Sequence, residues 1–195
     1  MYFKVRLGGF GAKEKSLTNY MKDYLDICRK VFAQYKELGE KAMNQLDEEQ
    51  LNWAPSAESN SIVLIVKHLY GNMLSRWTDF LTTDGEKEWR NRDNEFVIDK
   101  KLTREELNFM WEDGWALFFR TLYSLTDEDL GKIVKIRGED HTVIEALQRQ
   151  TAHYSSHIGQ IIYIAKVCKD KDWNSLSIPR GKSKEFNDKL TGKKY

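Results

Sequence analysis

The strongest constraint on the fold of this chain is a helical spacing of apolar residues that recurs in four long segments. Apolar positions follow steps of three and four from about Leu17 to Leu46, and the same spacing returns over residues 60–81, 103–124 and 143–169. A Thr-x-x-Glu capping box opens each of the last two segments, at Thr103–Glu106 and at Thr142–Glu145. Four amphipathic helices in a chain of 195 residues predict an all-α protein built as a four-helix bundle.

The remaining segments predict an extension, two irregular connections and a tail. Residues 1–16 include a Gly-rich stretch without a helical period, so we expect a flexible N-terminal extension before one bundle domain at residues 17–190, which ends in a basic tail. Eight of the twelve residues 84–95 are charged, which indicates a long loop of the kind that is often functional or mobile. Residues 132–141 could form a short two-stranded excursion.

Charge and hydropathy exclude several classes of function. The formal net charge of +1 argues against a general nucleic-acid binder. No apolar run approaches the roughly 20 residues that span a bilayer, and residues 1–15 do not have the pattern of a signal peptide. Two widely separated cysteines fit a reducing compartment. We therefore expect a cytoplasmic protein that binds neither nucleic acid nor membranes.

Three histidines are candidate metal ligands. His153 and His157 lie four residues apart on the fourth predicted helix, so both rings can reach one ion. A helical wheel places His157 inside the apolar stripe of that helix and His153 about 40° away, at its edge. His68 lies in the middle of the second predicted helix, beside its apolar stripe. Three imidazoles would leave coordination positions open, as in catalytic sites, but three packed and hydrogen-bonded histidines without a metal remain an alternative.

Two glycines inside these helices suggest that other groups approach closely. Gly in a helix interior costs about 1 kcal/mol relative to Ala, so a packing or functional reason is expected for it. Gly71 lies one turn from His68, and Gly159 lies near His157. Both are also compatible with ordinary contacts between helices.

Three arginines near the second predicted helix are candidates for substrate binding. Arg76, Arg90 and Arg92 could each hold a substrate carboxylate through forked hydrogen bonds. The alternative is that they pair with the acidic residues nearby, which are Asp79, Asp84, Asp93 and Glu95.

The histidine pattern, together with two longer motifs, resembles the DinB-like (DinB/YfiT-type) superfamily of metalloproteins. The motifs are NSIVLIVKHLYGNMLSRW in the second predicted helix and TAHYSSHIGQIIYIAK in the fourth. The runs SRWTDFLTTDGEKEWRNRDNEF and SLSIPRGKS are similar to one bacterial subgroup of that superfamily. The likeness extends over about residues 21–190.

The resemblance implies a fold, a cofactor and an activity. It implies a DinB/YfiT-like four-helix bundle that forms a homodimer and binds one divalent metal ion, nickel or zinc, through His68, His153 and His157. Relatives include bacillithiol S-transferases and mycothiol-dependent maleylpyruvate isomerases, in which a low-molecular-weight thiol binds the metal and attacks a small electrophile. We therefore expect a metal-dependent thiol transferase of the bacillithiol type. A metal-dependent hydrolase and a non-catalytic, metal-stabilised or stress-related interaction protein stay open, and no individual catalytic residue is predicted.

Overall fold

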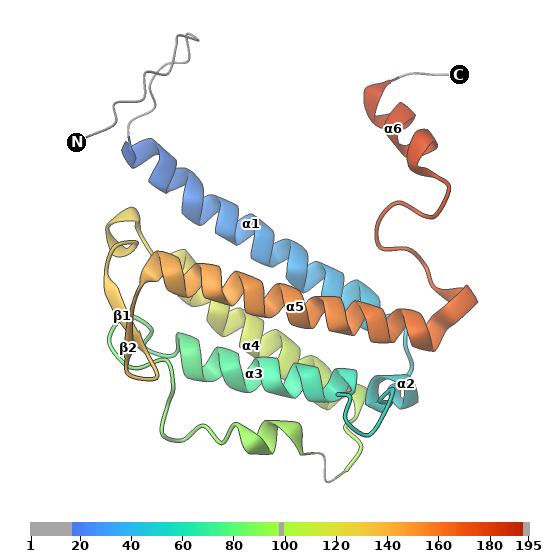
Figure 1. Cartoon of the computed structure of the whole chain (residues 1–195), viewed down its shortest axis with the longest axis horizontal. Coiled ribbons are helices and arrows are strands. Elements are labelled where there is room, and N and C mark those ends of the chain that lie inside the picture. The colour runs from blue at the N-terminus through green and yellow to red at the C-terminus, as the bar shows by residue number, and fades with distance from the viewer. Residues whose placement is uncertain (1–16, 98–99, 193–195) are drawn as a thin grey trace, which may run out of the picture.

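Four long helices form the body of the protein in a computed structural model that describes residues 17–97 and 100–192. They are α1 (Leu17–Met43), α3 (Ile62–Trp77), α4 (Arg104–Ser124) and α5 (Val143–Lys169) (Figure 1). The two predicted capping boxes form, since Thr103 and Thr142 each accept a hydrogen bond from the backbone amide of the glutamate three residues later. The all-α bundle predicted from the sequence is thereby confirmed. The expected flexible extension, residues 1–16, lies outside the described residues.

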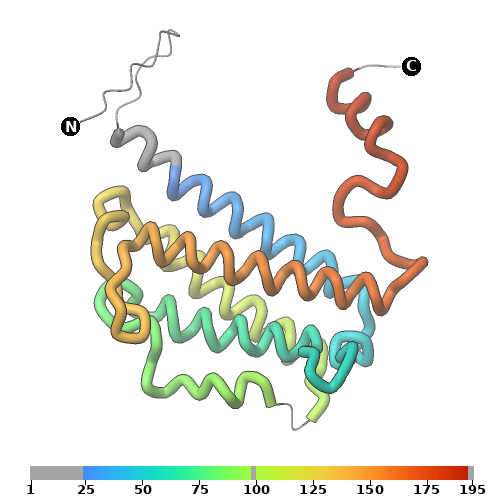
Figure 2. Tube along the Cα trace, in the orientation of Figure 1, coloured from blue at the N-terminus to red at the C-terminus, as the bar shows by residue number. Residues whose placement is uncertain are grey.

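The helices run in an up–down–down–up order. Helices α1 and α5 lie side by side and point the same way, and α3 and α4 both point the opposite way. Because α3 and α4 are parallel, the chain must return along the bundle between them. Figure 2 shows that residues 78–97 make this crossover along the outside of α3. The crossover includes a 3₁₀ turn, η1 (Asp93–Phe96), that packs against α3.

Aromatic side chains from all four helices fill the middle of the bundle. The rings of Phe32, Trp77, Trp115 and Tyr154 surround Phe118, with ring centroids 4.5–5.7 Å from its own. The indole Nε1 of Trp77 donates a hydrogen bond to the Tyr154 hydroxyl at 2.9 Å, so the polar atoms of this buried pair satisfy each other. Each aromatic contact of this kind contributes about 0.5–1.5 kcal/mol beyond area burial. This cluster fixes α3 against α5, the two helices that carry the histidines.

The short elements lie at the ends of the bundle. They are α2 (Glu48–Asn52), η2 (Asp127–Asp129), β1 (Ile133–Ile136), β2 (Glu139–Thr142), η3 (Asp170–Asp172) and α6 (Ser183–Thr191). Strands β1 and β2 are antiparallel, with Ile136 opposite Glu139, which confirms the predicted two-stranded excursion. The sequence patterns missed α2 and α6. Helix α2 is too short to show a period, and α6 stands away from the bundle in Figure 1, where no core selects its pattern.

A search of the helices within the described ranges finds none that is both long enough and apolar enough to cross a membrane.

Candidate metal centre

Three histidine side chains converge between α3 and α5. The Nε2 atom of His153 lies 3.2 Å from Nε2 of His68 and 3.1 Å from Nε2 of His157. His153 and His157 share one face of α5 because they are one turn apart, and α3 brings His68 to the same point from the opposite side. The three residues form a group that could hold a metal ion. Metal binding itself stays a prediction.

The spacing of these nitrogens fits a metal ion. An ion bound about 2.0–2.1 Å from two imidazole nitrogens, at a ligand angle of roughly 90–110°, holds them about 2.9–3.4 Å apart. The separations of His153 Nε2 from the other two Nε2 atoms, 3.1 and 3.2 Å, fall in that interval, and all three ligand nitrogens lie within 4.8 Å of one another. Side chains supply three nitrogen donors here, so coordination positions would remain for an external ligand.

The second nitrogen of each ring lies beside a group that can orient it. Nδ1 of His68 is 2.8 Å from a carboxylate oxygen of Glu95, and Nδ1 of His157 is 3.0 Å from Oε1 of Gln160. Nδ1 of His153 is 3.1 Å from the side-chain amide of Gln150, which can present either its nitrogen or, after rotation, its oxygen. Such outer partners fix the tautomer of a ligating histidine and direct its Nε2 lone pair towards the ion.

Glu95 is the best-held of these partners. The crossover brings it against α3, where it is only 6% exposed, and Arg90 clamps its two oxygens with contacts of 2.7 and 3.0 Å. A Cβ atom on Gly71 would lie 2.3 Å from the Glu95 carboxylate, so only glycine leaves room for it. Burial raises the pKa of Glu95, but hydrogen bonds from His68 and Arg90 outweigh it and hold the pKa below its usual value. Glu95 is therefore ionised at neutral pH and accepts from His68.

Burial keeps the histidines of α5 uncharged. It is the main cause that lowers the pKa of His153 to about 3, and the neighbouring His157, His68, Arg76 and Arg90 lower it further. Burial also lowers the pKa of His157, with a smaller contribution from His68, although its hydrogen bond with Gln160 raises it. Neutral imidazole is the form that ligates a metal, so these two rings need not lose a proton at neutral pH in order to bind one.

The histidines lie at the side of a cavity of about 610 Å³ that is rich in arginine. Besides the three histidines, its lining includes five arginines, which are Arg76, Arg90, Arg92, Arg137 and Arg149. The other lining residues are Asn60, Asn72, Phe96, Gln150 and Gln160, so no carboxylate lines the cavity within the described part of the chain.

The three arginines predicted from the sequence all line this cavity but differ in their contacts. Arg90 is paired with Glu95 and also contacts Glu86 at 3.2 Å. Arg92 lies over the Phe96 ring, 5.2 Å from its centroid, and that ring stacks on His68. Arg76 is buried and makes no ion pair with the described residues. Substrate binding by these residues stays a prediction.

The structure adds detail at His157 and corrects one inference at Gly159. His157 is half-buried and lines the cavity, whereas the next residue, Ile158, is buried in the core. The close approach suggested at Gly159 is wrong. A Cβ atom on Gly159 would meet nothing within 4 Å, so no group approaches closely there.

Four residues of the site were not singled out from the sequence. The sequence patterns suggest only possible ion pairs for Glu95, and they single out no role for Gln150, Arg137 or Arg149. The signal for Glu95 was Gly71, whose missing side chain makes the space that the carboxylate occupies. Arg149 had a signal in its spacing, since it precedes His153 by one helical turn.

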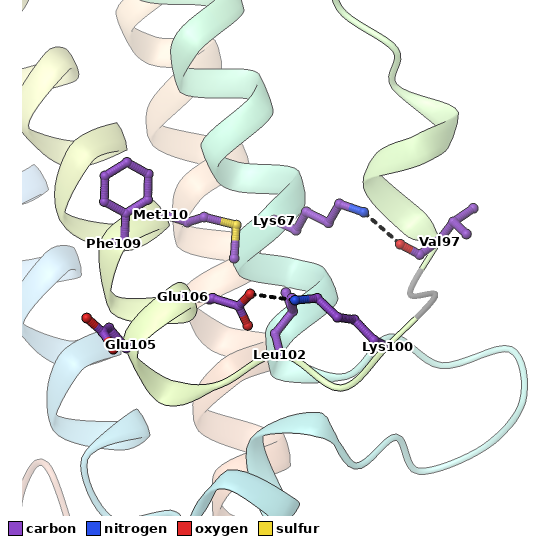
Figure 3. Close-up of a pocket in the computed structure, with 8 residues that line it drawn as sticks. All are labelled: Lys67, Val97, Lys100, Leu102, Glu105, Glu106, Phe109 and Met110. Carbon is purple, nitrogen blue, oxygen red and sulfur yellow. Dashed lines mark hydrogen bonds and ion pairs between the residues drawn. The ribbon is translucent and has the colours of Figure 1, made fainter.

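A second cavity, of about 720 Å³, lies between α3, α4 and the crossover (Figure 3). Its lining is a mixture of apolar side chains, such as Phe109 and Met110, and paired charges. Lys67 donates to the carbonyl of Val97 at 2.7 Å, and Lys100 pairs with Glu106 at 2.8 Å. It has no cluster of histidines.

Comparison with known proteins identifies a family without assigning an activity. Among curated proteins, no significant match to this chain is found. The model of a family described as "Protein of unknown function (DUF1572)" matches residues 19–182, which include all three histidines and most of the chain. The chain therefore belongs to the DUF1572 family.

Proposed function

We propose that this chain is a DinB-like metalloprotein in which His68, His153 and His157 bind one divalent metal ion, nickel or zinc. The observation that carries the proposal is the convergence of three Nε2 atoms, two pairs of which are 3.1 and 3.2 Å apart. The acceptors beside Nδ1 of His68 and His157, which are Glu95 and Gln160, support it, because they leave the Nε2 lone pairs of those rings free for an ion. The DinB-like motifs around the same residues support it independently.

We further propose that the protein is a transferase for a low-molecular-weight thiol of the bacillithiol type. A divalent metal ion with open positions lowers the pKa of a bound thiol or water and so supplies a nucleophile at neutral pH. The described lining offers no carboxylate that could act as a base for water, whereas its arginines favour an anionic thiolate. In the transfer, the thiol would release its proton to solvent, its sulfur would bond to an electrophilic carbon, and the leaving group would depart with the electron pair of its broken bond to that carbon.

Within this mechanism the protein side chains orient the histidine ring and exclude water from it. Glu95 and Arg90 fix the ring of His68, and the Phe96 ring stacks on it at a centroid distance of 4.9 Å. Arg92 extends over the outer face of Phe96. Arg90, Arg92 and Phe96 of the crossover line the cavity beside His68, which is only 5% exposed to water.

The assembly and the location of the protein are also proposed from the DinB-like resemblance. We propose a homodimer in the cytoplasm. Exposed apolar side chains on α6, Phe186 and Leu190, support association of chains. Sedimentation equilibrium at micromolar concentrations tests the dimer, and a single species with the 23.0 kDa mass of the monomer would contradict it.

Cobalt-loaded protein provides the test of thiol chemistry. Addition of bacillithiol should produce a thiolate-to-cobalt absorption band, and the nickel- or zinc-loaded protein should transfer the thiol to an aryl halide. The variant His157→Ala should lose both signals, and the control Phe109→Ala in the second cavity should keep them. Stoichiometric metal without any thiol-induced band would instead favour the non-catalytic, metal-stabilised protein.

A further inference from the structure

Arg76 is a buried cation that forms no ion pair within the described part of the chain. Its side chain lies on the last turn of α3 and is 4% exposed, and its Nε and Nη1 atoms have no hydrogen-bond partner among the described residues. Burial is the main cause that lowers the pKa of the guanidinium; Arg149 and Arg90 lower it further, while Tyr154 and Glu86 raise it. An unpaired buried charge destabilises a folded protein, so its retention here requires another reason.

Arg76 differs in this respect from Arg90, its neighbour in the same cavity. Two carboxylates, Glu95 and Glu86, neutralise Arg90. Arg149 is exposed on α5 one turn before His153. Arg137 lies at the tip of the β1–β2 hairpin, and its Nε is 3.2 Å from the same Glu86 oxygen that contacts Arg90, so one carboxylate is shared between two arginines. The positive charge of the cavity therefore exceeds what the neighbouring acidic residues balance.

Arg137 reaches the cavity from a strained position. Its backbone φ is +56° and that of Gly138 is +80°, as the two-residue turn of a tight hairpin requires. Asn or Gly is the usual residue at the first of these positions, because side chains such as arginine fit a positive φ poorly. Asp84 holds the turn in place by accepting the backbone amides of Arg137 and Gly138 at 2.9 and 2.7 Å. Asp84 thus fixes the hairpin tip to the crossover. The tip carries an arginine at a position whose backbone conformation disfavours one.

We propose that Arg76, Arg137 and Arg149 form an oxyanion subsite beside the three-histidine centre, which binds a carboxylate or phosphate group of the substrate. The inference rests on the proposed function in that it defines the substrate of the same site: a small electrophile that carries a negatively charged group. The volume of about 610 Å³ is in the range of small-molecule sites. Guanidinium groups bind both anions through paired hydrogen bonds, so the shared chemistry is an oxyanion.

Calorimetric titration of metal-free protein tests the subsite separately from the metal. The two probes are inorganic phosphate and succinate, and their relative affinity tells which kind of oxyanion the subsite prefers. We expect saturable binding of at least one probe, weakened about tenfold or more in Arg76→Met, since a hydrogen bond to a charged group is lost. Arg137→Asn should weaken binding as well. The control Arg120→Gln, an exposed arginine on α4, should bind as the wild type does.

Thermal unfolding separates a binding role from a structural one. Arg76→Met removes an unpaired buried charge and Arg137→Asn removes a strained residue, so both should keep or raise the melting temperature of the metal-free protein. If neither probe binds the wild type, or if both bind Arg76→Met equally well, the subsite is refuted. A metal titration of the same samples keeps the two proposals apart. Normal metal uptake without anion binding rejects only the subsite, and anion binding without metal uptake rejects only the metal centre.

Discussion

Two cavities lie on either side of the crossover, and consecutive residues of α3 face them. His68 lines the cavity that contains the three histidines, and Lys67 lines the cavity of Figure 3. The second cavity is the larger, about 720 against about 610 Å³. None of its lining residues is fully buried, and Phe109 is 63% exposed. The histidine cavity instead has four buried polar side chains, which are His68, Asn72, Arg76 and Gln150. Two nitrogens of Arg76 have no hydrogen-bond partner among the described residues.

The volume of a cavity therefore does not identify the functional site. A cavity lined by exposed apolar side chains and surface ion pairs costs the fold little, because each of those groups remains in contact with water. Burial of Glu95, Arg76 and His153 removes charged or polar groups from water, and the fold compensates with a specific contact for all but Arg76.

The largest expected effect is on the pH dependence of stability in the metal-free protein. The pKa of His153 is lowered from 6.5 to about 3 in the folded state, and that of His157 is also lowered. The unfolded chain therefore binds more protons below pH 6.5, so the free energy of unfolding must fall as the pH falls. Between pH 6.5 and 4.5 the loss should reach up to about 3 kcal/mol, measured by urea unfolding.

That interval isolates the histidines. The lowered pKa of Glu95 contributes stability that is lost only below its unfolded value of 4.5. The variant His153→Gln should flatten the slope above pH 4.5, and Phe109→Ala should leave it as it is. A wild-type protein with constant stability from pH 6.5 to 4.5 would show that His153 is not held neutral by burial.

The next effect concerns two glycines in equivalent helical settings. Gly71→Ala places a methyl group 2.3 Å from the present position of the Glu95 carboxylate, which must move away from His68. Loss of such an outer partner should weaken metal affinity about 10- to 100-fold. Gly159→Ala meets nothing within 4 Å, so it should raise stability by about 1 kcal/mol and leave metal affinity unchanged. Competition with a chromogenic chelator measures both affinities, and equal values in the two variants would contradict the role of Glu95.

The smallest effect is expected in the cavity of Figure 3. Phe109→Ala removes a ring that is 63% exposed, so the free energy of unfolding should change by less than about 0.5 kcal/mol. Metal content and thiol transfer should not change. A loss of transfer activity in this variant would move the substrate from the arginine-lined cavity to the cavity of Figure 3.

Local sequence signals predicted the bundle and assigned the three histidines to the correct helices. The capping residues Thr103 and Thr142 set two helix starts, because their interactions are made within four residues of sequence. The prediction that His153 and His157 act as a pair followed from their spacing of one helical turn. The prediction for His68 followed from its position beside the apolar stripe of another helix of the bundle. These features depend on periodicity, which a sequence displays directly.

The rest of the site depends on how distant segments meet. Glu95 belongs to a charged loop without a period, and it reaches His68 only because the crossover must return along α3. Arg137 lies on a hairpin turn whose backbone amides donate to the Asp84 carboxylate at 2.7–2.9 Å, and the two segments are more than fifty residues apart in the sequence. No local pattern encodes such contacts. Gly71 signalled that a group lies close, but its partner was visible only in the folded chain.

Metal content tests the central claim most directly. Protein purified without a metal-affinity tag should be analysed for nickel, zinc and other transition metals, alongside His157→Ala and the control Gly159→Ala. We predict about one divalent ion per chain in the wild type and in Gly159→Ala, and a near-complete loss in His157→Ala with its helical circular dichroism intact. A wild type that neither retains a metal nor takes one up on titration would contradict the account, because the three histidines would then be packed side chains only.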